Sequence, residues 1–577
     1  MTGAELLRKI TRLGRTRGVA VSFNPRHGKG SHGTLHYGSH KPISGSWELA
    51  KSANPCKRNG MSTDRGVAAA HPAGEQPLVE YGAERSVIAD TFAGRVHMEW
   101  EAGERAAMTP LGQLPFFIEY LKQGGLFDGW VAGCPLSLTS PNAPSKRDIL
   151  GTVMLSVLAG HRRYAHITTL RCDPVNPPLL GMTKVVSEDA VRRALSKIEA
   201  EAGRAWLQEQ LDYCTRPLLR EPWILDVDTT VKPLYGHQEG AVVGYNPKKP
   251  GRPSHTYHSY MLANLRLVLE VEVQAGNQHA AKHSAPGLWT LLDRLGPQCA
   301  PWLLRGDRDW GNEGVISKAE CRGQAYLFKL RLTKRVKRML ERAMRDDDWR
   351  DAGAGWQGKH GEIRLMGWSR QRRVVLLRRR LAGVMITQPQ ADGQLALGFV
   401  EIDEERQEAW EYAVLVTSLE AEVVTIGQLY RDRGDCENSF DELKNHWGWG
   451  GFTTHDLTRC RIMARIVAVV FNWWNLFVRL ADPDHHREAI TSRPLLLQAI
   501  GRQTNHAGRA TVTITSTHGE RDRARRALTR IAAFFATLRE TAEQLTDLDR
   551  WYRILSHALV KYLKGRQLDP PRRLQAA

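Results

Sequence analysis

The sequence predicts an α/β fold in which a mixed sheet is flanked by helices. Two strand-like runs open the central part of the chain, WILDVDTTVKPL and SYMLANLRLVLEVEVQAGN. Helical and strand-like runs then alternate, as in AAKHSAPGLWTLLDRLG, PWLLRGDRDWGNEGV and GQAYLFKLRL. A charged helix follows from Tyr430, after further strand-like pieces (RRVVLLRRRL and EYAVLVTS). Strands first, then strands alternating with helices, are typical of a layered α/β domain.

This α/β domain is expected to span residues 216–480, with a β-rich insertion at about 340–415 before the last charged helix. The most apolar run of the domain, IMARIVAVVFNWWNLFVRL, is interrupted by arginines and asparagines. An uninterrupted span of about 20 apolar residues is therefore missing. We expect this run to be a buried helix of a soluble protein.

The zones on either side differ from the α/β domain in pattern. Residues 76–215 carry apolar residues at helical spacing, and Ser187 is the expected N-cap of one helix. This helical region is expected to bind DNA, and a simple helical packing domain is the alternative. Residues 481–577 also read as helical and basic, and they are a candidate for dimerisation.

Composition narrows the choice of partner. The chain has 577 residues and a formal net charge of +19, from 81 Lys+Arg against 62 Asp+Glu. Such an excess indicates a polyanionic partner, most often nucleic acid, and a basic membrane-surface protein is the rival class. The eight cysteines are scattered without a CxxC pair, which excludes a zinc ribbon or a disulfide framework and fits a reducing cytoplasm. No apolar segment follows a basic start, so a signal peptide is not expected.

Paired acids follow two of the predicted strands. Asp226 and Asp228 are two residues apart, so their side chains share one face of the strand. Asp307 and Asp309 follow the apolar strand of PWLLRGDRDW, and Glu437 lies on the late helix. Burying unpaired carboxylates costs several kcal/mol, and an early strand end with the acids in solvent is the alternative. Carboxylates from three elements make an oxygen-only site suited to Mg²⁺ or Mn²⁺, where two ions about 3.5–4 Å apart can promote phosphoryl transfer.

The late helix carries a polar stripe. The stripe consists of Tyr430, Arg433, Glu437 and Lys444. On one continuous helix these four side chains would point within about 60° of one another around the helix axis, and they would span about 21 Å along it. Arg433 and Glu437 are four apart and could pair locally, so a solvated charged face is the alternative. Lys444 is two turns from Glu437, too far to pair with it, which indicates that the stripe meets a ligand.

These residues resemble the DDE transposases of bacterial insertion sequences, which share a ribonuclease-H-like catalytic core. Four residues fit the Y-(2)-R-(3)-E-(6)-K signature of that group without a gap: Tyr430, Arg433, Glu437 and Lys444. LDVDTTV and RGDRDWGNEGVI are similar to its two aspartate segments, and GHQEGAVVGYNPKKPGRPSHTYH is similar to one branch of the group. The likeness runs from about residue 76 to the end and is strongest over 223–330 and 426–450.

The resemblance implies roles for individual residues. Asp228, Asp307 and Glu437 would hold two Mg²⁺ ions, for which Mn²⁺ can substitute. Tyr430, Arg433 and Lys444 would contact phosphates at the transposon end, where arginine offers a planar fork and lysine a point charge.

Two neighbouring acids compete for these roles. Asp226 is the competitor of Asp228, which is preferred because it directly precedes two threonines. Asp309 is the competitor of Asp307, which is preferred because it closes the apolar strand. Both alternatives stay open at the level of the sequence.

Asp307 and Glu437 are 130 residues apart (437 − 307), more than the core needs. The family often has a β-rich insertion there, and in some relatives an aromatic residue of the insertion holds a flipped base. A tryptophan is more often a core residue, so no such role is assigned to the four in this region: Trp349, Trp356, Trp368 and Trp410.

Residues 1–60 have a resemblance of their own. ELLRKITRLGRTRGVAVSFNPRHGKGSHGTLHYGS is similar to the opening of HicA-like toxins, which are small mRNA interferases. This implies a catalytic role for His32, beside Lys29 and Ser31, as a general acid or base on RNA. The likeness ends after Lys41, where a polar linker begins, so we expect an inactive fusion remnant with Met61 as the original start.

Together these features predict a cut-and-paste DNA transposase, which cleaves the ends of its element and joins them to target DNA. Its expected partners are double-stranded DNA and a second copy of the chain in a synaptic complex, in the cytoplasm of a bacterium and associated with the nucleoid. Two alternatives stand beside it. One is a ribonuclease or toxin acting through His32, and the other is a catalytically inactive DNA-binding relative.

Overall fold

The computed structural model describes residues 21–24, 34–37, 79–80, 86–91, 94–99, 107–381, 400–403, 408–515, 519–540 and 544–571. The chain forms two compact units, Met1–Glu101 and Ala102–Ala577. His32, Lys29, Ser31 and Met61 lie outside the described residues. In the first unit two antiparallel strands pair with each other, and three more form a small sheet: β1 (Val21–Asn24), β2 (Thr34–Tyr37), β3 (Val79–Glu80), β4 (Ser86–Thr91) and β5 (Gly94–Glu99).

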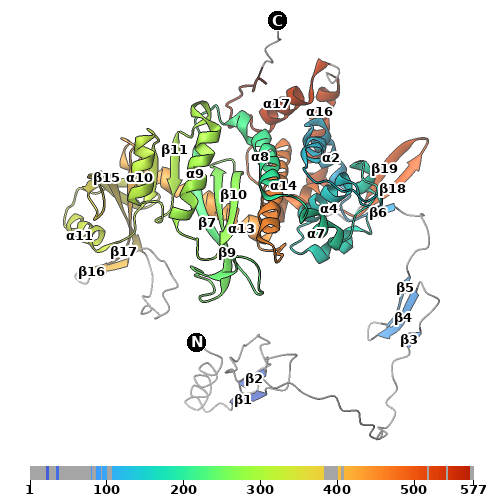
Figure 1. The fold of residues 1–577 in the computed structure, drawn as a ribbon, viewed down its shortest axis with the longest axis horizontal. Coiled ribbons are helices and arrows are strands. Elements are labelled where there is room, and N and C mark those ends of the chain that lie inside the picture. The colour runs from blue at the N-terminus through green and yellow to red at the C-terminus, as the bar shows by residue number, and fades with distance from the viewer. Residues whose placement is uncertain are drawn as a thin grey trace. The chain divides into compact units, whose positions relative to one another are not determined.

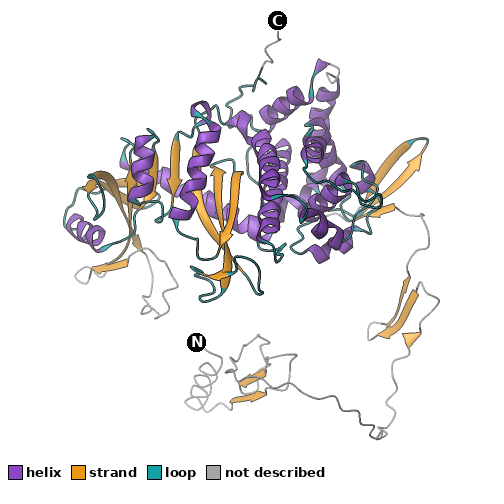
Figure 2. Cartoon of the chain, in the orientation of Figure 1, coloured by secondary structure: helices purple, strands orange, loops and turns teal. Residues whose placement is uncertain are grey.

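A mixed sheet is the centre of the second unit (Figure 1, Figure 2). Over the described residues it has eleven strands, nine of which follow the order β10-β9-β7-β11-β12-β17-β15-β14-β13. The strands are β7 (Ile224–Pro233), β8 (Val242–Val243), β9 (Pro253–Leu262), β10 (Leu267–Ala275), β11 (Leu303–Gly306), β12 (Tyr326–Lys329), β13 (Arg350–Gly353), β14 (Trp356–Ile363), β15 (Arg372–Leu381), β16 (Val400–Asp403) and β17 (Glu408–Thr417).

The sheet is parallel only around β11, which pairs in parallel with β7 and with β12, while the other pairs are antiparallel. β7 shows why these residues form a strand. Leu225 and Val227 are fully buried on one face, while Asp226 and Asp228 alternate with them on the other. This large mixed sheet with helices on its faces confirms the expected α/β class.

The β-rich insertion extends the central sheet. β17 pairs with β12, and β15, β14 and β13 follow outward, so the inserted strands share one ladder with the strands that carry the acids. Each of its four tryptophans has an arginine guanidinium over its ring at 4.2–4.9 Å: Trp349 and Trp410 with Arg378, Trp356 with Arg379, and Trp368 with Arg372. These rings are therefore occupied by side chains of the insertion itself.

The long apolar helix α14 (Leu457–Ala481) packs against β10 and against α8 (Ala200–Thr215). It is the one helix in the described part of the chain that is long and apolar enough to cross a membrane, and 94% of its apolar window is buried inside the protein. The expected buried helix is confirmed. Its polar residues also have partners: Asn472 exchanges hydrogen bonds with the backbone of Val268, and Arg465 pairs with the Glu270 carboxylate at 2.8 Å.

Helices surround α14 on the side away from the sheet (Figure 1). The Ser187 hydroxyl accepts a hydrogen bond from the Ala190 backbone N–H, which confirms the predicted N-cap. The helices before the sheet are α2 (Leu114–Gln123), α3 (Leu126–Gly133), α4 (Lys146–Leu158), α5 (Ile167–Leu170), α6 (Asn176–Leu179), α7 (Glu188–Leu195) and α8. Those within or after it are α9 (Ala281–Leu295), α10 (Glu313–Cys321), α11 (Lys334–Ala343), α12 (Val423–Arg431), α13 (Gly434–Asn445), α14, α15 (Ala489–Leu496), α16 (Arg521–Glu540) and α17 (Asp547–Ala558).

The helical zones contain strands that the sequence pattern did not predict. Residues 76–215 were expected to be mostly helical; among the described residues of this zone, strands come first and the first helix begins at Leu114. The zone 481–577 likewise contains a hairpin, β18 (Gly501–His506) and β19 (Arg509–Ile514), which pairs with β6 (Ala107–Thr109). The hairpin is mostly exposed, and only β19 alternates apolar with polar residues, over six positions that lie between long helical runs.

Candidate active site

Two of the predicted acids meet where parallel strands end. The register of β7 with β11 pairs Val227 with Gly306, so the next residues, Asp228 and Asp307, come opposite each other. Neighbouring strands lie about 4.8 Å apart, which brings the two carboxylates to the same edge of the sheet. Lys329 ends β12 at the corresponding position beside Asp307, because Gly306 pairs with Phe328.

Glu437 reaches this edge from α13, which packs against β7. One guanidinium connects it to the strand: Arg433 donates from Nη1 to the Glu437 carboxylate at 2.7 Å and from Nη2 to the Asp228 carboxylate. The Arg433 and Asp228 side chains are 6% and 13% exposed, whereas Glu437 is 64% exposed. The three acids therefore converge, with Glu437 on the side open to solvent.

The polar stripe is divided between two helices, which corrects the expectation of one continuous helix. α12 ends at Arg431, and α13 begins at Gly434. At the break the Arg433 N–H donates to the carbonyl of Tyr430 at 3.2 Å, while the carbonyl of Leu429, its partner in a regular helix, accepts from Arg305 Nη1. The buried arginine takes the acceptor that would have continued the helix.

Burial shapes the electrostatics of the two strand acids. Burial raises the pKa of Asp228, the positive charge of Arg433 opposes that rise, and the neighbouring Asp307 adds to it. Burial also raises the pKa of Asp307, although its carboxylate accepts a hydrogen bond from the Asp309 N–H at 2.9 Å. Two carboxylates held this close favour a cation between them.

Asp226, the competitor of Asp228, is engaged elsewhere. Its carboxylate forms a bidentate ion pair with Arg305, at 2.6 and 2.7 Å, and the two side chains are 1% and 0% exposed. Such a fork-on-fork pair uses both carboxylate oxygens. Asp226 and Arg305 thus form a buried ion pair beneath the acid cluster.

Asp309, the competitor of Asp307, also has partners of its own. His279 lies 3.7 Å from its carboxylate and Arg331 lies 2.6 Å from it. These two neighbours hold the pKa of Asp309 at about 2, against the opposing effect of burial. The Asp309 carboxylate is therefore engaged by His279 and Arg331, in the turn after β11.

The remaining members of the stripe lie beside the acids. Tyr430 is half-buried at the end of α12, and burial raises the pKa of its hydroxyl. Lys444 is half-buried near the end of α13, where burial and then the neighbouring Lys248 lower its pKa to about 8. Arg433, expected to contact DNA, has its side chain on the acids in this structure.

The donor set is made of carboxylates, which fit a hard divalent cation. Among the described residues, no three His, Cys, Asp or Glu side chains are gathered closely enough to hold a metal ion as they stand. The Arg433 guanidinium is the cation that Asp228 and Glu437 hold.

Several residues of this edge were missed at the level of the sequence. Lys329 and Arg305 lie on strands whose alignment with β7 depends on the folded sheet. His279 and Tyr245 come from loops, and their rings lie 4.6 Å apart. The run GYNPKKPGR, rich in turn-forming and basic residues, was the available signal for the Tyr245 loop.

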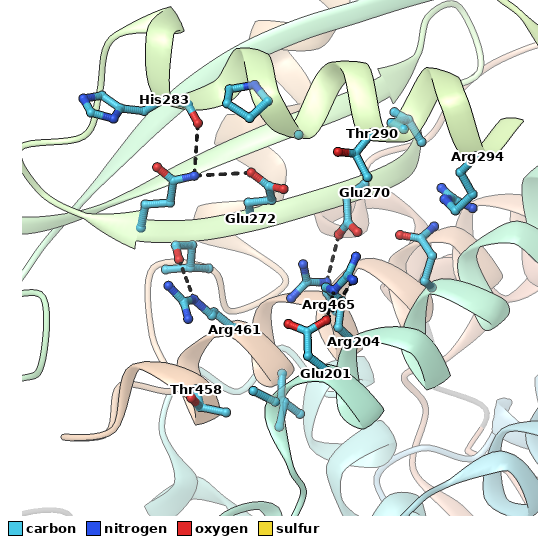
Figure 3. Close-up of a pocket in the computed structure, with 18 residues that line it drawn as sticks. Glu201, Arg204, Glu270, Glu272, His283, Thr290, Arg294, Thr458, Arg461 and Arg465 are labelled. Atoms are coloured by element: carbon cyan, nitrogen blue, oxygen red, sulfur yellow. Dashed lines mark hydrogen bonds and ion pairs between the residues drawn. The ribbon is translucent and has the colours of Figure 1, made fainter.

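A separate cavity of about 440 Å³ lies between β10, α8, α9 and α14 (Figure 3). Glu272 in its wall is in register with His258, and His258 with Thr229, so this cavity lies on the sheet face opposite Asp228. The cavity is distinct from the acid cluster. Its charged lining residues are Glu201, Arg204, Glu270, Glu272, Arg294, Arg461 and Arg465.

Among the comparisons with known proteins, a family model agrees with the resemblance seen in the sequence. No curated protein matches the chain. A cryo-EM structure of a piggyBac transposase synaptic complex with hairpin DNA is similar at 9% identity and a TM-score of 0.35, over 82% of this chain and 86% of that one. The family model described as transposase DDE domain group 1 matches residues 142–535, more than half of the sequence. The chain therefore belongs to the DDE transposases of this group.

Proposed function

We propose that this transposase cleaves DNA at the ends of an insertion sequence and joins the ends to target DNA, by a cut-and-paste mechanism. The observation that carries the proposal is the convergence of Asp228, Asp307 and Glu437 from two parallel strand ends and one helix. The sheet order β10-β9-β7-β11-β12 supports a ribonuclease-H-like core, with the inserted strands added after it.

Mg²⁺ or Mn²⁺ fits this donor set, and Asp228, Asp307 and Glu437 are the residues that would hold it. When bound, divalent ions supply the Lewis acid that activates water and stabilises the leaving oxygen. The protein contributes the separation of the two strand acids, set by the pairing of β7 with β11, and the exposed third acid on α13. Because Arg433 bridges two of these acids, its guanidinium would compete with a divalent ion for their oxygens.

DNA phosphates would offer Arg433 another anionic partner. Tyr430 and Lys444 flank it on the same stripe and would bind neighbouring phosphates, as the net charge of +19 favours. A homodimer that bridges two DNA ends, and a site of action in the bacterial cytoplasm at the nucleoid, belong to the same proposal.

The test is cleavage of a supercoiled plasmid that carries the reading frame with its native flanking DNA. With Mg²⁺ or Mn²⁺ we expect cuts at inverted repeats that bracket the frame, and with EDTA none, because the acids then have no divalent ion to hold. Binding without cleavage under every metal condition would support an inactive relative. Cleavage of RNA that is lost on His32→Ala would support the toxin alternative.

Arg433→Gln is expected to bind Mn²⁺ about tenfold or more tightly than the wild type in the absence of DNA, because a competing positive charge leaves the acids. Isothermal titration measures the affinity, and the rise in Tm on adding Mn²⁺ checks that the variant is folded. Arg431→Gln is the matched control, since Arg431 lies two residues away on α12 and its guanidinium donates to the Gln428 side chain at 2.8 Å rather than to the acids. Equal Mn²⁺ affinity in wild type and Arg433→Gln would contradict the competition.

A further inference from the structure

The loop of residues 244–252, here called the Tyr245 loop, connects β8 to β9 and borders the acid cluster. Tyr245 is 48% exposed, and its ring lies 4.6 Å from that of His279 at an angle of 58°. Its hydroxyl accepts a hydrogen bond from Arg308 Nη2 at 3.4 Å. Arg308 directly follows Asp307, and His279 lies beside Asp309. Tyr245 therefore stands next to the end of β11.

The same loop reaches the other side of the acids. Lys248 is exposed and near enough to Lys444 of α13 to lower its pKa. Lys444 in turn is near enough to Asp228 for the carboxylate charge to oppose this lowering of the lysine pKa. The loop thus passes from the Asp307 side to the α13 side of the site, with an aromatic ring at one end and a lysine at the other.

The backbone of the loop is anchored to the turn after β10. A Cβ on Gly244 would lie 2.0 Å from the Gly276 carbonyl oxygen, so only glycine allows this approach. Within the loop, the buried Asn246 side chain accepts from the Lys249 N–H at 3.1 Å. The ring of Tyr245 is therefore presented from a fixed backbone.

Cations gather on the outer part of the loop. The Lys249 ammonium and the Arg252 guanidinium lie 4.9 and 4.8 Å from the centre of the Tyr235 ring, and Tyr235 is 67% exposed. Exposed aromatic rings among lysine and arginine side chains are the pattern of single-stranded nucleic acid binding, where bases stack and phosphates meet cations. A paired duplex does not present its bases in this way.

We propose that the Tyr245 loop binds the strand being cut, with Tyr245 stacked on an unpaired base next to the scissile phosphate. His279 backs the ring, and Lys248, Lys249 and Arg252 contact phosphates along the same strand. This inference rests on the proposed function and deepens it, because it assigns the recognition of an unpaired base to a loop outside the acid cluster.

The experiment measures stacking without cleavage. The probe is a duplex of the flanking inverted repeat, nicked at its end, with 2-aminopurine at each of the two bases next to the nick, in EDTA. Wild-type protein should quench the fluorescence on binding. Tyr245→Ala should lose the quench and bind the probe roughly tenfold more weakly, while Tyr245→Phe, which keeps the ring and loses the Arg308 hydrogen bond, should retain both.

Trp302→Ala is the matched control, because Trp302 is as exposed as Tyr245, at 48%, and precedes β11 at the end of that strand away from Asp307. It should keep the quench. If wild type binds the probe without a change in fluorescence, or if Tyr245→Ala quenches as wild type does, the stacking inference is overturned. The plasmid assay reports separately on the proposed function, since it can fail while the quench persists.

Discussion

Glu437→Gln is expected to reduce cleavage of the plasmid by about three orders of magnitude or more while leaving DNA binding nearly unchanged. The substitution keeps the size of the side chain and removes one of three charges available to a divalent ion. Losing several kcal/mol of transition-state stabilisation corresponds to that factor. Gel analysis of the cleaved plasmid gives the rate, and fluorescence anisotropy gives the affinity.

Asp441→Asn provides the control for Glu437→Gln. It removes the same charge from the same helix, one turn further on, where Asp441 is exposed and accepts a hydrogen bond from Asn445 at 2.7 Å. Cleavage by this variant should stay within about twofold of the wild type. Near-normal cleavage by Glu437→Gln would remove α13 from the chemistry and with it the proposed three-acid site.

Arg305→Met is expected to destabilise the protein by about 3–5 kcal/mol, because it leaves the Asp226 carboxylate buried without its charge partner. Arg305 is 0% exposed and also donates to the carbonyl of Leu429, where α12 gives way to α13. The variant should therefore also disturb the position of Arg433. Denaturant unfolding followed by fluorescence measures the free energy of unfolding.

Two further variants separate charge pairing from mere loss of an arginine. Arg322→Met breaks the surface pair with Asp293, whose side chain is 65% exposed, and should cost no more than about 1 kcal/mol. The double variant Asp226→Leu with Arg305→Met should recover much of the lost stability, since no charge is left unpaired. A double variant as unstable as Arg305→Met alone would show that the pair is not the cause.

The sequence predicted the order of the acids and the kinds of element that carry them. Asp228 and Asp307 follow apolar runs that are strands, and Glu437 lies on a helix after the inserted strands. That these three acids hold a metal ion remains a prediction. The choice between Asp226 and Asp228 was beyond the sequence, because it depends on Arg305, which lies 79 residues away and meets Asp226 only through the pairing of β7 with β11.

The expected helices are interrupted for reasons that the spacing of polar and apolar residues in the sequence does not show. The polar stripe fits one helix by spacing, yet a tertiary hydrogen bond to Leu429 ends α12 early. The hairpin of β18 and β19 has alternating exposure with few apolar residues, and Ala507 and Gly508 at its turn have positive φ. The marks of this turn in the sequence were Gly508 and the alternating run RATVTI that follows it.

The break between α12 and α13 joins two parts of the protein mechanically. α12 packs against β13 and β14 of the insertion, whereas α13 packs against β7. Arg433 lies at the joint, with its side chain on the acids. The placement of the Arg433 guanidinium on the acids therefore depends on the packing of the inserted strands against α12 as well as on the packing of α13 against β7.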